Sequence, residues 1–147
     1  MLNIATGFRI VDCLFPIAIG QSELIIGDRQ TGKSTLALCS IISQYNFNIE
    51  LSIKRMLFCV FTCIAQKCSN VMRFYELLIR SKCNKFTSII FVSIVESMSL
   101  QFVSPLSATC ISEYFRNQSL SCLIIYDDLS KHSIAYEQLS LILRKTI

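Results

Sequence analysis

A chain of 147 residues, 52% hydrophobic and 16% charged, is long and apolar enough for one folded domain, which excludes a disordered protein. Its net charge of +4 comes from scattered lysines and arginines without a basic cluster, which argues against nucleic-acid binding. Polar residues and Pro105 interrupt the apolar runs, so the sequence predicts no membrane-spanning helix.

The eight cysteines include no C-x-x-C pair, and the chain has one histidine, so no zinc site is expected. The N-terminus shows neither a secretory signal nor an arginine-rich presequence. We therefore interpret the cysteines as reduced thiols in an internal compartment. Several lie in apolar runs, where a thiol behaves as a small hydrophobic group.

The first half of the chain predicts a helix between two strands. Residues 6–21 show no clear period and are expected to lead into a short buried strand over 23–26. Residues 34–45 predict a helix with one apolar face, formed by Leu38, Ile41, Ile42 and Tyr45. Residues 46–52 are polar enough for a loop, and the apolar run 57–64 predicts a strand covered on both faces.

The second half continues the alternation. Helices are predicted over 70–81, over 106–116 with Pro105 near its start, and over 131–144, and strands over 87–95 and 123–127. The residues predicted to face inward from the first and last of these helices are Val71, Tyr75, Leu78 and Ile79, and Ala135, Leu139, Ile142 and Leu143. The alternation predicts an α/β fold, a mostly parallel sheet with helices on both faces.

Residues 27–34 have the spacing of a phosphate-binding loop, in which four residues separate a first glycine from Gly32, Lys33 and Ser34. Glycine permits the positive φ angles and close approach that let backbone N–H groups converge on a polyphosphate. The N-terminus of the following helix directs its positive end at the anion. Lys33 would neutralise phosphate oxygens, and the Ser34 hydroxyl would ligate Mg²⁺, which prefers oxygen.

A nucleotide site of this kind also needs a carboxylate at the end of a neighbouring strand, and Asp127 has that position. Asp128 is predicted instead to cap the last helix. The expected place for a catalytic base is the end of the strand over 57–64, where the chain has Gln66. A glutamine cannot accept a proton, although it can orient water, so the sequence argues against catalysis without excluding it.

Longer stretches around these residues resemble the alpha subunit of the F-type ATP synthase. They are residues 20–34, with the specific loop interior Asp28-Arg29-Gln30-Thr31, residues 123–131, and the run Glu113-Tyr114-Phe115-Arg116. The resemblance covers nearly the whole chain and well under half of a usual alpha subunit. It implies a partial RecA-like nucleotide-binding domain over 1–147, with a lead-in over 1–20 and the phosphate-loop core over 21–147. The family's N-terminal barrel and C-terminal helical region would be absent.

The resemblance also implies the ligands. ATP or ADP with Mg²⁺ would bind, with Ser34 and Asp127 as metal ligands. The nucleotide contacts implied are Gly27, Asp28, Arg29, Gln30, Thr31, Gly32, Lys33, Ser34 and Thr35. Gln66 matches the position where the beta subunit has its catalytic glutamate, so no catalytic residue is implied.

The implied partners are the beta and other head subunits, and a second chain that carries the rest of alpha. Membrane contact would be peripheral, through the complex. The run Glu113–Arg116 favours the matrix side of the mitochondrial inner membrane, with the plastid thylakoid and the bacterial inner membrane as alternatives.

Two other functions stay open. Ala18, Ile19 and Ser22 replace a glycine and two arginines of the family pattern, which agrees with a decayed fragment without function. The intact Lys33 and Asp127 argue against decay. A stand-alone P-loop NTPase for transport or secretion is the second alternative, and Gln66 and the loop interior argue against it.

Overall fold

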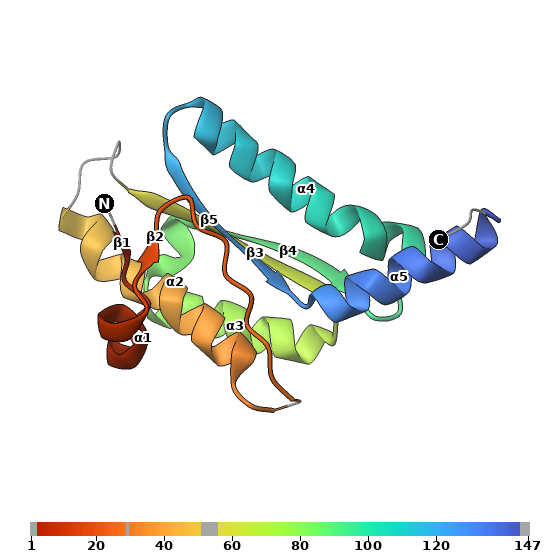
Figure 1. The fold of residues 1–147 in the computed structure, drawn as a ribbon, viewed down its shortest axis with the longest axis horizontal. Coiled ribbons are helices and arrows are strands. Elements are labelled where there is room, and N and C mark those ends of the chain that lie inside the picture. The colour runs from red at the N-terminus through yellow and green to blue at the C-terminus, as the bar shows by residue number, and fades with distance from the viewer. Residues whose placement is uncertain (1–2, 29, 51–55, 145–147) are drawn as a thin grey trace.

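A three-stranded parallel sheet lies between two pairs of helices (Figure 1). The strand order is β4 (Thr87–Ser93), β3 (Leu57–Gln66), β5 (Ser121–Asp127). Helices α2 (Lys33–Glu50) and α3 (Cys68–Arg80) cover one face, and α4 (Met98–Asn117) and α5 (Leu129–Ile142) the other. This computed structural model describes residues 3–28, 30–50 and 56–144, and it confirms the predicted α/β fold with a parallel sheet.

The strand register brings two of the predicted site residues to the same end of the sheet. Strand β3 pairs with β5 from Leu57–Ser121 to Cys63–Asp127, and with β4 up to Gln66–Ser93. A shift in register after Ile64 accompanies the positive φ of Ala65 at 49°. Since all three strands are parallel, Gln66 and Asp127 both lie at the carboxyl ends of neighbouring strands.

The core centres on β3, of whose ten residues eight are buried. Phe61 is fully buried on the face of α2 and α3 and meets the ring of Phe74 edge-on, with the centroids 5.6 Å apart. The other members of this layer are Ala37, Leu38, Ile41, Cys59, Cys63, Val71, Leu78 and Cys83. Burial of both faces of β3 explains why its sequence is apolar throughout rather than alternating.

All eight cysteines are free thiols, and they divide by position. Cys59, Cys63 and Cys83 are buried, whereas Cys13, Cys68 and Cys110 are exposed. Burial raises the pKa of the Cys83 and Cys122 thiols to about 11. The core thiols therefore stay protonated and pack as small hydrophobic groups.

Helix α4 begins eight residues before the predicted start at 106, so Pro105 is interior and buried. Proline cannot donate to the carbonyl four residues before it, here that of Gln101. The Ser104 hydroxyl donates to that carbonyl at 3.0 Å. The Ser97 side chain caps the true N-terminus, accepting from the Leu100 N–H.

Helix α2 also extends beyond the prediction, because residues 46–50 are helical rather than looped. The remainder of that predicted loop, at 51–52, lies outside the described residues. Asn48 is 2% exposed, and its amide exchanges two 3.0 Å hydrogen bonds with the backbone N–H and carbonyl of Leu57. A polar side chain therefore holds the end of α2 against the first residue of β3.

In α3 and α5, fewer side chains face the core than the sequence predicted. In α3, Val71 and Leu78 are buried, but Tyr75 and Ile79 are each 45% exposed, and Phe74 packs on the core instead. In α5, Ala135 is buried and Leu139 half-buried, whereas Ile142 and Leu143 are exposed. The predicted faces were too wide because apolar residues on the outer side were counted as core.

The prediction of a strand over 23–26 is wrong. Residues 21–28 have no regular secondary structure, and none of them pairs with a described strand. The side chains of Leu24, Ile25 and Ile26 are 70%, 44% and 84% exposed. The apolar run satisfies the composition of a strand, but a strand also requires a neighbour with which to exchange hydrogen bonds.

The lead-in contains structure that the sequence did not indicate, a helix α1 (Arg9–Leu14) between the paired strands β1 (Asn3–Ile4) and β2 (Ile17–Ala18). The Asp12 carboxylate organises its start. It accepts hydrogen bonds from the Thr6 hydroxyl at 2.7 Å, the Thr6 N–H at 2.9 Å and the Gly7 N–H at 3.1 Å. Partial burial opposes ionisation of this carboxyl, but the three hydrogen bonds outweigh it and lower its pKa.

The lowered Asp12 pKa makes stability depend on pH. The ionised carboxylate contributes stability above its unfolded pKa of about 3.9, and this contribution is lost as the pH falls through the lower folded pKa. We expect the melting-temperature difference between the wild type and Asp12→Asn to be greatest above about pH 5 and to decrease as the pH falls below about 4. Thermal unfolding monitored by circular dichroism measures it. The exposed Glu137→Gln is the control, and a pH-independent Asp12 difference would contradict this role.

No helix among the described residues has both the length and the apolar character needed to cross a bilayer.

Candidate nucleotide site

The predicted phosphate loop, residues 27–34, follows a segment without regular secondary structure rather than the predicted strand, and it leads into the first turn of α2 (Figure 1). Gly32 has a φ of +91°, a conformation that disfavours any side chain, and a Cβ on Gly27 would lie 2.9 Å from the Thr31 Oγ1. The Thr31 hydroxyl donates to the Asp28 carbonyl at 2.8 Å, which closes the loop across its tip. Both motif glycines therefore serve the curvature of the loop.

Lys33 is the first residue of α2, and its ammonium donates to the backbone carbonyls of Gly27 and Asp28. The positive charge is thus held against the loop, where a phosphate would need it. The first helical hydrogen bond runs from the Leu36 N–H to the Gly32 carbonyl at 2.9 Å. The N–H groups of residues 33–35 precede that bond and are the helix-terminal donors that bind anions.

The remaining loop residues predicted to contact nucleotide are arranged around this turn. Gln30 has a φ of 65° and is exposed, as are Asp28 and Thr35, while Ser34 is half-buried at the second position of α2. Arg29 lies outside the described residues. Among the described residues, no hydrogen bond joins the loop to Gln66 or Asp127.

Asp127 ends β5, and its side chain has the features of a cation ligand. The carboxylate atom Oδ2 is buried and has no hydrogen-bond partner among the described residues. A buried carboxylate oxygen without a partner is unfavourable unless a cation or a donor joins it. Carboxylate and hydroxyl oxygens are the donors that Mg²⁺ prefers, so Asp127 and Ser34 fit this ion chemically.

Asp128, one residue later, has the role predicted for it. It is the N-cap of α5, and its Oδ1 accepts from the Lys131 N–H at 2.9 Å. The Lys131 ammonium lies 3.9 Å from the other carboxylate oxygen. The neighbouring aspartates therefore separate into one that holds the helix and one with a free oxygen.

These features agree with the outcome of sequence comparison. A model of the nucleotide-binding domain of the ATP synthase alpha/beta family matches residues 7–147. The chain belongs to this family. A relative named ATP synthase subunit alpha from Neorickettsia sennetsu is 48% identical over 140 residues, which are 95% of this chain and 28% of the relative.

Two further alpha subunits show the same pattern of coverage. A relative from Wolbachia sp. subsp. Drosophila simulans is 45% identical over 140 residues, 27% of its length. A mitochondrial alpha subunit of Trypanosoma brucei brucei is 41% identical over 143 residues, 24% of its length. The chain thus corresponds to about a quarter of each curated alpha subunit that it matches here.

In the structure, Asp127 has a neighbour that the sequence did not indicate. Cys63 is its register partner on β3 and is fully buried. Burial first, and then the Asp127 charge, raise the pKa of the Cys63 thiol to about 12, although Lys131 opposes them. Cys63 therefore stays a neutral thiol and does not compete with oxygen ligands for a hard cation.

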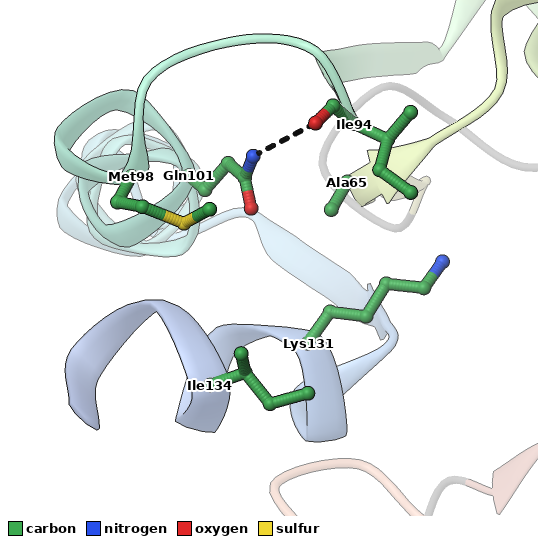
Figure 2. Close-up of a pocket in the computed structure, with 6 residues that line it drawn as sticks. All are labelled: Ala65, Ile94, Met98, Gln101, Lys131 and Ile134. Carbon is green, nitrogen blue, oxygen red and sulfur yellow. Dashed lines mark hydrogen bonds between the residues drawn. The ribbon is translucent and has the colours of Figure 1, made fainter. Parts of the chain in front are cut away.

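A cavity of about 170 Å³ opens between α4 and α5, beyond the carboxyl end of β3 (Figure 2). Its lining is mostly apolar, with Lys131 extending past Ala65 and Ile94 and Gln101 opposite. The Gln101 amide donates to the carbonyls of Glu96 at 3.0 Å and Ile94 at 3.4 Å, so it holds the turn into α4. None of its lining residues belongs to the predicted phosphate loop, so this cavity is separate from that loop.

Proposed function

We propose that this chain is the nucleotide-binding part of an F-type ATP synthase alpha subunit, which holds Mg-ATP or Mg-ADP without hydrolysing it. The similarity to alpha subunits supports the family role, and the phosphate loop with Lys33 at its mouth supports nucleotide binding. Gly27, Asp28, Arg29, Gln30, Thr31, Gly32, Lys33, Ser34 and Thr35 would contact the nucleotide. Ser34 and Asp127 would hold Mg²⁺, which would screen the phosphate charge.

The absence of turnover rests on Gln66. It lies at the carboxyl end of β3, beside the strand that ends in Asp127, where a hydrolytic site would place a carboxylate base. The amide would bind or orient water but would not remove its proton. This is the observation that favours a non-catalytic site over a stand-alone NTPase.

We also propose partners and a location for this chain. The beta and other head subunits of the synthase would surround this domain, and the rest of an alpha subunit would complete it. The complex would be peripheral to a membrane. The mitochondrial relative supports the matrix side of the inner membrane, and the bacterial relatives support the bacterial inner membrane as the alternative.

Two measurements on one preparation test the proposal. Titration with a fluorescent ATP analogue, with Mg²⁺ and with EDTA, is expected to show binding that is tighter with Mg²⁺, and a phosphate-release assay is expected to show no phosphate release above the protein-free rate. Continuous phosphate release would contradict the non-catalytic role and favour the stand-alone NTPase. No binding in either condition would favour a decayed fragment.

Replacing Asp127 with asparagine is expected to weaken Mg-ATP binding roughly 10- to 100-fold, because it removes the charge of a metal ligand. Binding in EDTA is expected to stay the same, since the phosphate loop is untouched. Asp128→Asn is the matched control, because asparagine caps a helix about as well as aspartate. Equal Mg²⁺ dependence in both variants would contradict the metal role of Asp127.

A further inference from the structure

The cavity between α4 and α5 has the size and character of a site for one aromatic ring. Its volume is about 170 Å³, and most of its surface is apolar, with Ile94, Met98 and Ile134 in its walls (Figure 2). An ordered water needs roughly two to four polar partners, and this lining offers one amide and one ammonium group. An apolar cavity of about 150 Å³ binds benzene rather than water.

Gln101 directs an acceptor without a partner into this cavity. The residue is 3% exposed, and its Nε2 donates to the carbonyls of Ile94 and Glu96. Because a carbonyl can only accept, these two bonds fix which end of the amide is the donor. The Oε1 atom faces the cavity (Figure 2), and no described residue donates to it. A ligand that donates a hydrogen bond would satisfy this buried oxygen.

Lys131 contributes its hydrocarbon chain to the cavity rather than a free charge. The side chain extends from the first turn of α5, and its ammonium lies at the edge, beyond Ala65 (Figure 2). The ammonium is 3.9 Å from a carboxylate oxygen of Asp128, so its charge already has a partner. An anionic ligand would compete with that carboxylate, whereas a neutral one would pack along the methylene groups. The lining therefore favours a neutral ligand.

The cavity is accessible from solvent. Ile94, in the turn that follows β4, and Ile134, on α5, line it and are 53% and 52% exposed. A ligand would enter between them without opening the fold, and it would cover apolar surface that is now in contact with water. The Met98 thioether in the wall is a favourable neighbour for an aromatic ring.

We propose that the cavity between α4 and α5 binds a neutral aromatic molecule of one ring that carries a hydroxyl or N–H donor. The ring packs between Met98 and Ile134, and its donor bonds to the Oε1 atom of Gln101. None of the lining residues is assigned to the nucleotide, so this inference is independent of the proposed function.

Fluorine NMR with three one-ring probes tests the chemistry of the site. The probes 4-fluorophenol, 4-fluoroanisole and 4-fluorobenzoate are titrated with the 147-residue chain at pH 7, where a phenol is neutral. We expect 4-fluorophenol to bind with a Kd below about 1 mM. The ether oxygen of 4-fluoroanisole cannot donate to Gln101, so this probe is expected to bind at least about 5-fold more weakly. The charged 4-fluorobenzoate is expected to bind at least as weakly as 4-fluoroanisole.

Two variants that fill the cavity test its location. Ile134→Trp and Ile94→Trp enlarge a side chain in different parts of the lining, and each is expected to weaken 4-fluorophenol binding at least about 10-fold. Ile142→Trp is the matched control, because Ile142 is on the same helix as Ile134, is 72% exposed and is not in the lining. It is expected to bind like the wild type. All three replaced side chains are exposed, so circular dichroism is expected to show an unchanged fold.

Four results would overturn the inference. The first is 4-fluorophenol binding that both cavity-filling variants leave unchanged, which would indicate adsorption on other exposed apolar side chains. The second is equal binding of 4-fluoroanisole, which would show that no hydrogen bond to Gln101 forms. The third is tighter binding of 4-fluorobenzoate, which would indicate an anion site at Lys131. The fourth is no binding of 4-fluorophenol up to about 10 mM.

Discussion

Replacing Lys33 with alanine is expected to weaken Mg-ATP binding about 100-fold, which corresponds to about 3 kcal/mol. The ammonium is the one charged side chain that the described residues place on the loop carbonyls, and it would exchange those contacts for charge-assisted hydrogen bonds to phosphate. Alanine retains the helix start but leaves the phosphate charge uncompensated. Titration with a fluorescent ATP analogue measures the change.

The control for Lys33→Ala is Lys85→Ala, which removes an equally long cation from an exposed position in the 3-10 helix Cys83–Lys85. It is expected to bind Mg-ATP like the wild type. Both variants are expected to melt within about 2 °C of the wild type, because neither side chain is in the core. If Lys33→Ala bound within about 3-fold of the wild type, the loop would not be the phosphate site.

Replacing Asn48 with alanine is expected to destabilise the fold by roughly 2–4 kcal/mol. The Asn48 amide satisfies both the N–H and the carbonyl of Leu57 at 3.0 Å, and it is itself buried. Alanine would leave two buried backbone groups at the start of the central strand without partners. The melting temperature is expected to fall by about 5–15 °C in thermal unfolding.

The control for Asn48→Ala is Asn117→Ala at the exposed C-terminal end of α4, which is expected to change stability by less than about 0.5 kcal/mol. A melting temperature for Asn48→Ala equal to that of the control would show that water replaces the amide at Leu57. The backbone at that position would then not depend on the side chain.

The fold class and the elements of the sheet could be predicted because they depend on local pattern. The apolar runs of β3 and β5 are long enough to mark strands, and α2 carries an apolar face with the helical period. The features that were missed depend on tertiary partners. The last turn of α2 is held by Asn48 through Leu57, and Pro105 is tolerated in α4 because Ser104 compensates for it.

The strand predicted over 23–26 failed for a related reason. Composition tells which residues favour a strand, but a strand exists only where a neighbouring edge receives it, and no described strand does so here. The candidate site likewise has features that could be predicted from the sequence and one that could not. The loop, Asp127 and the Asp128 cap follow from motif and position, whereas the contact of Asp127 with Cys63 depends on a register that only the fold provides.

Because the cysteines divide into a buried and an exposed group, their reactivity can report the unfolding of this chain. With a pKa of about 11, the buried Cys83 has roughly 100-fold less thiolate at pH 8 than an ordinary thiol, and it is also shielded from reagents. Cys13, Cys68 and Cys110 are exposed and would react first with an alkylating reagent. The slow alkylation of the core thiols then times the opening of the sheet in the unmodified chain, without an engineered label or a tryptophan.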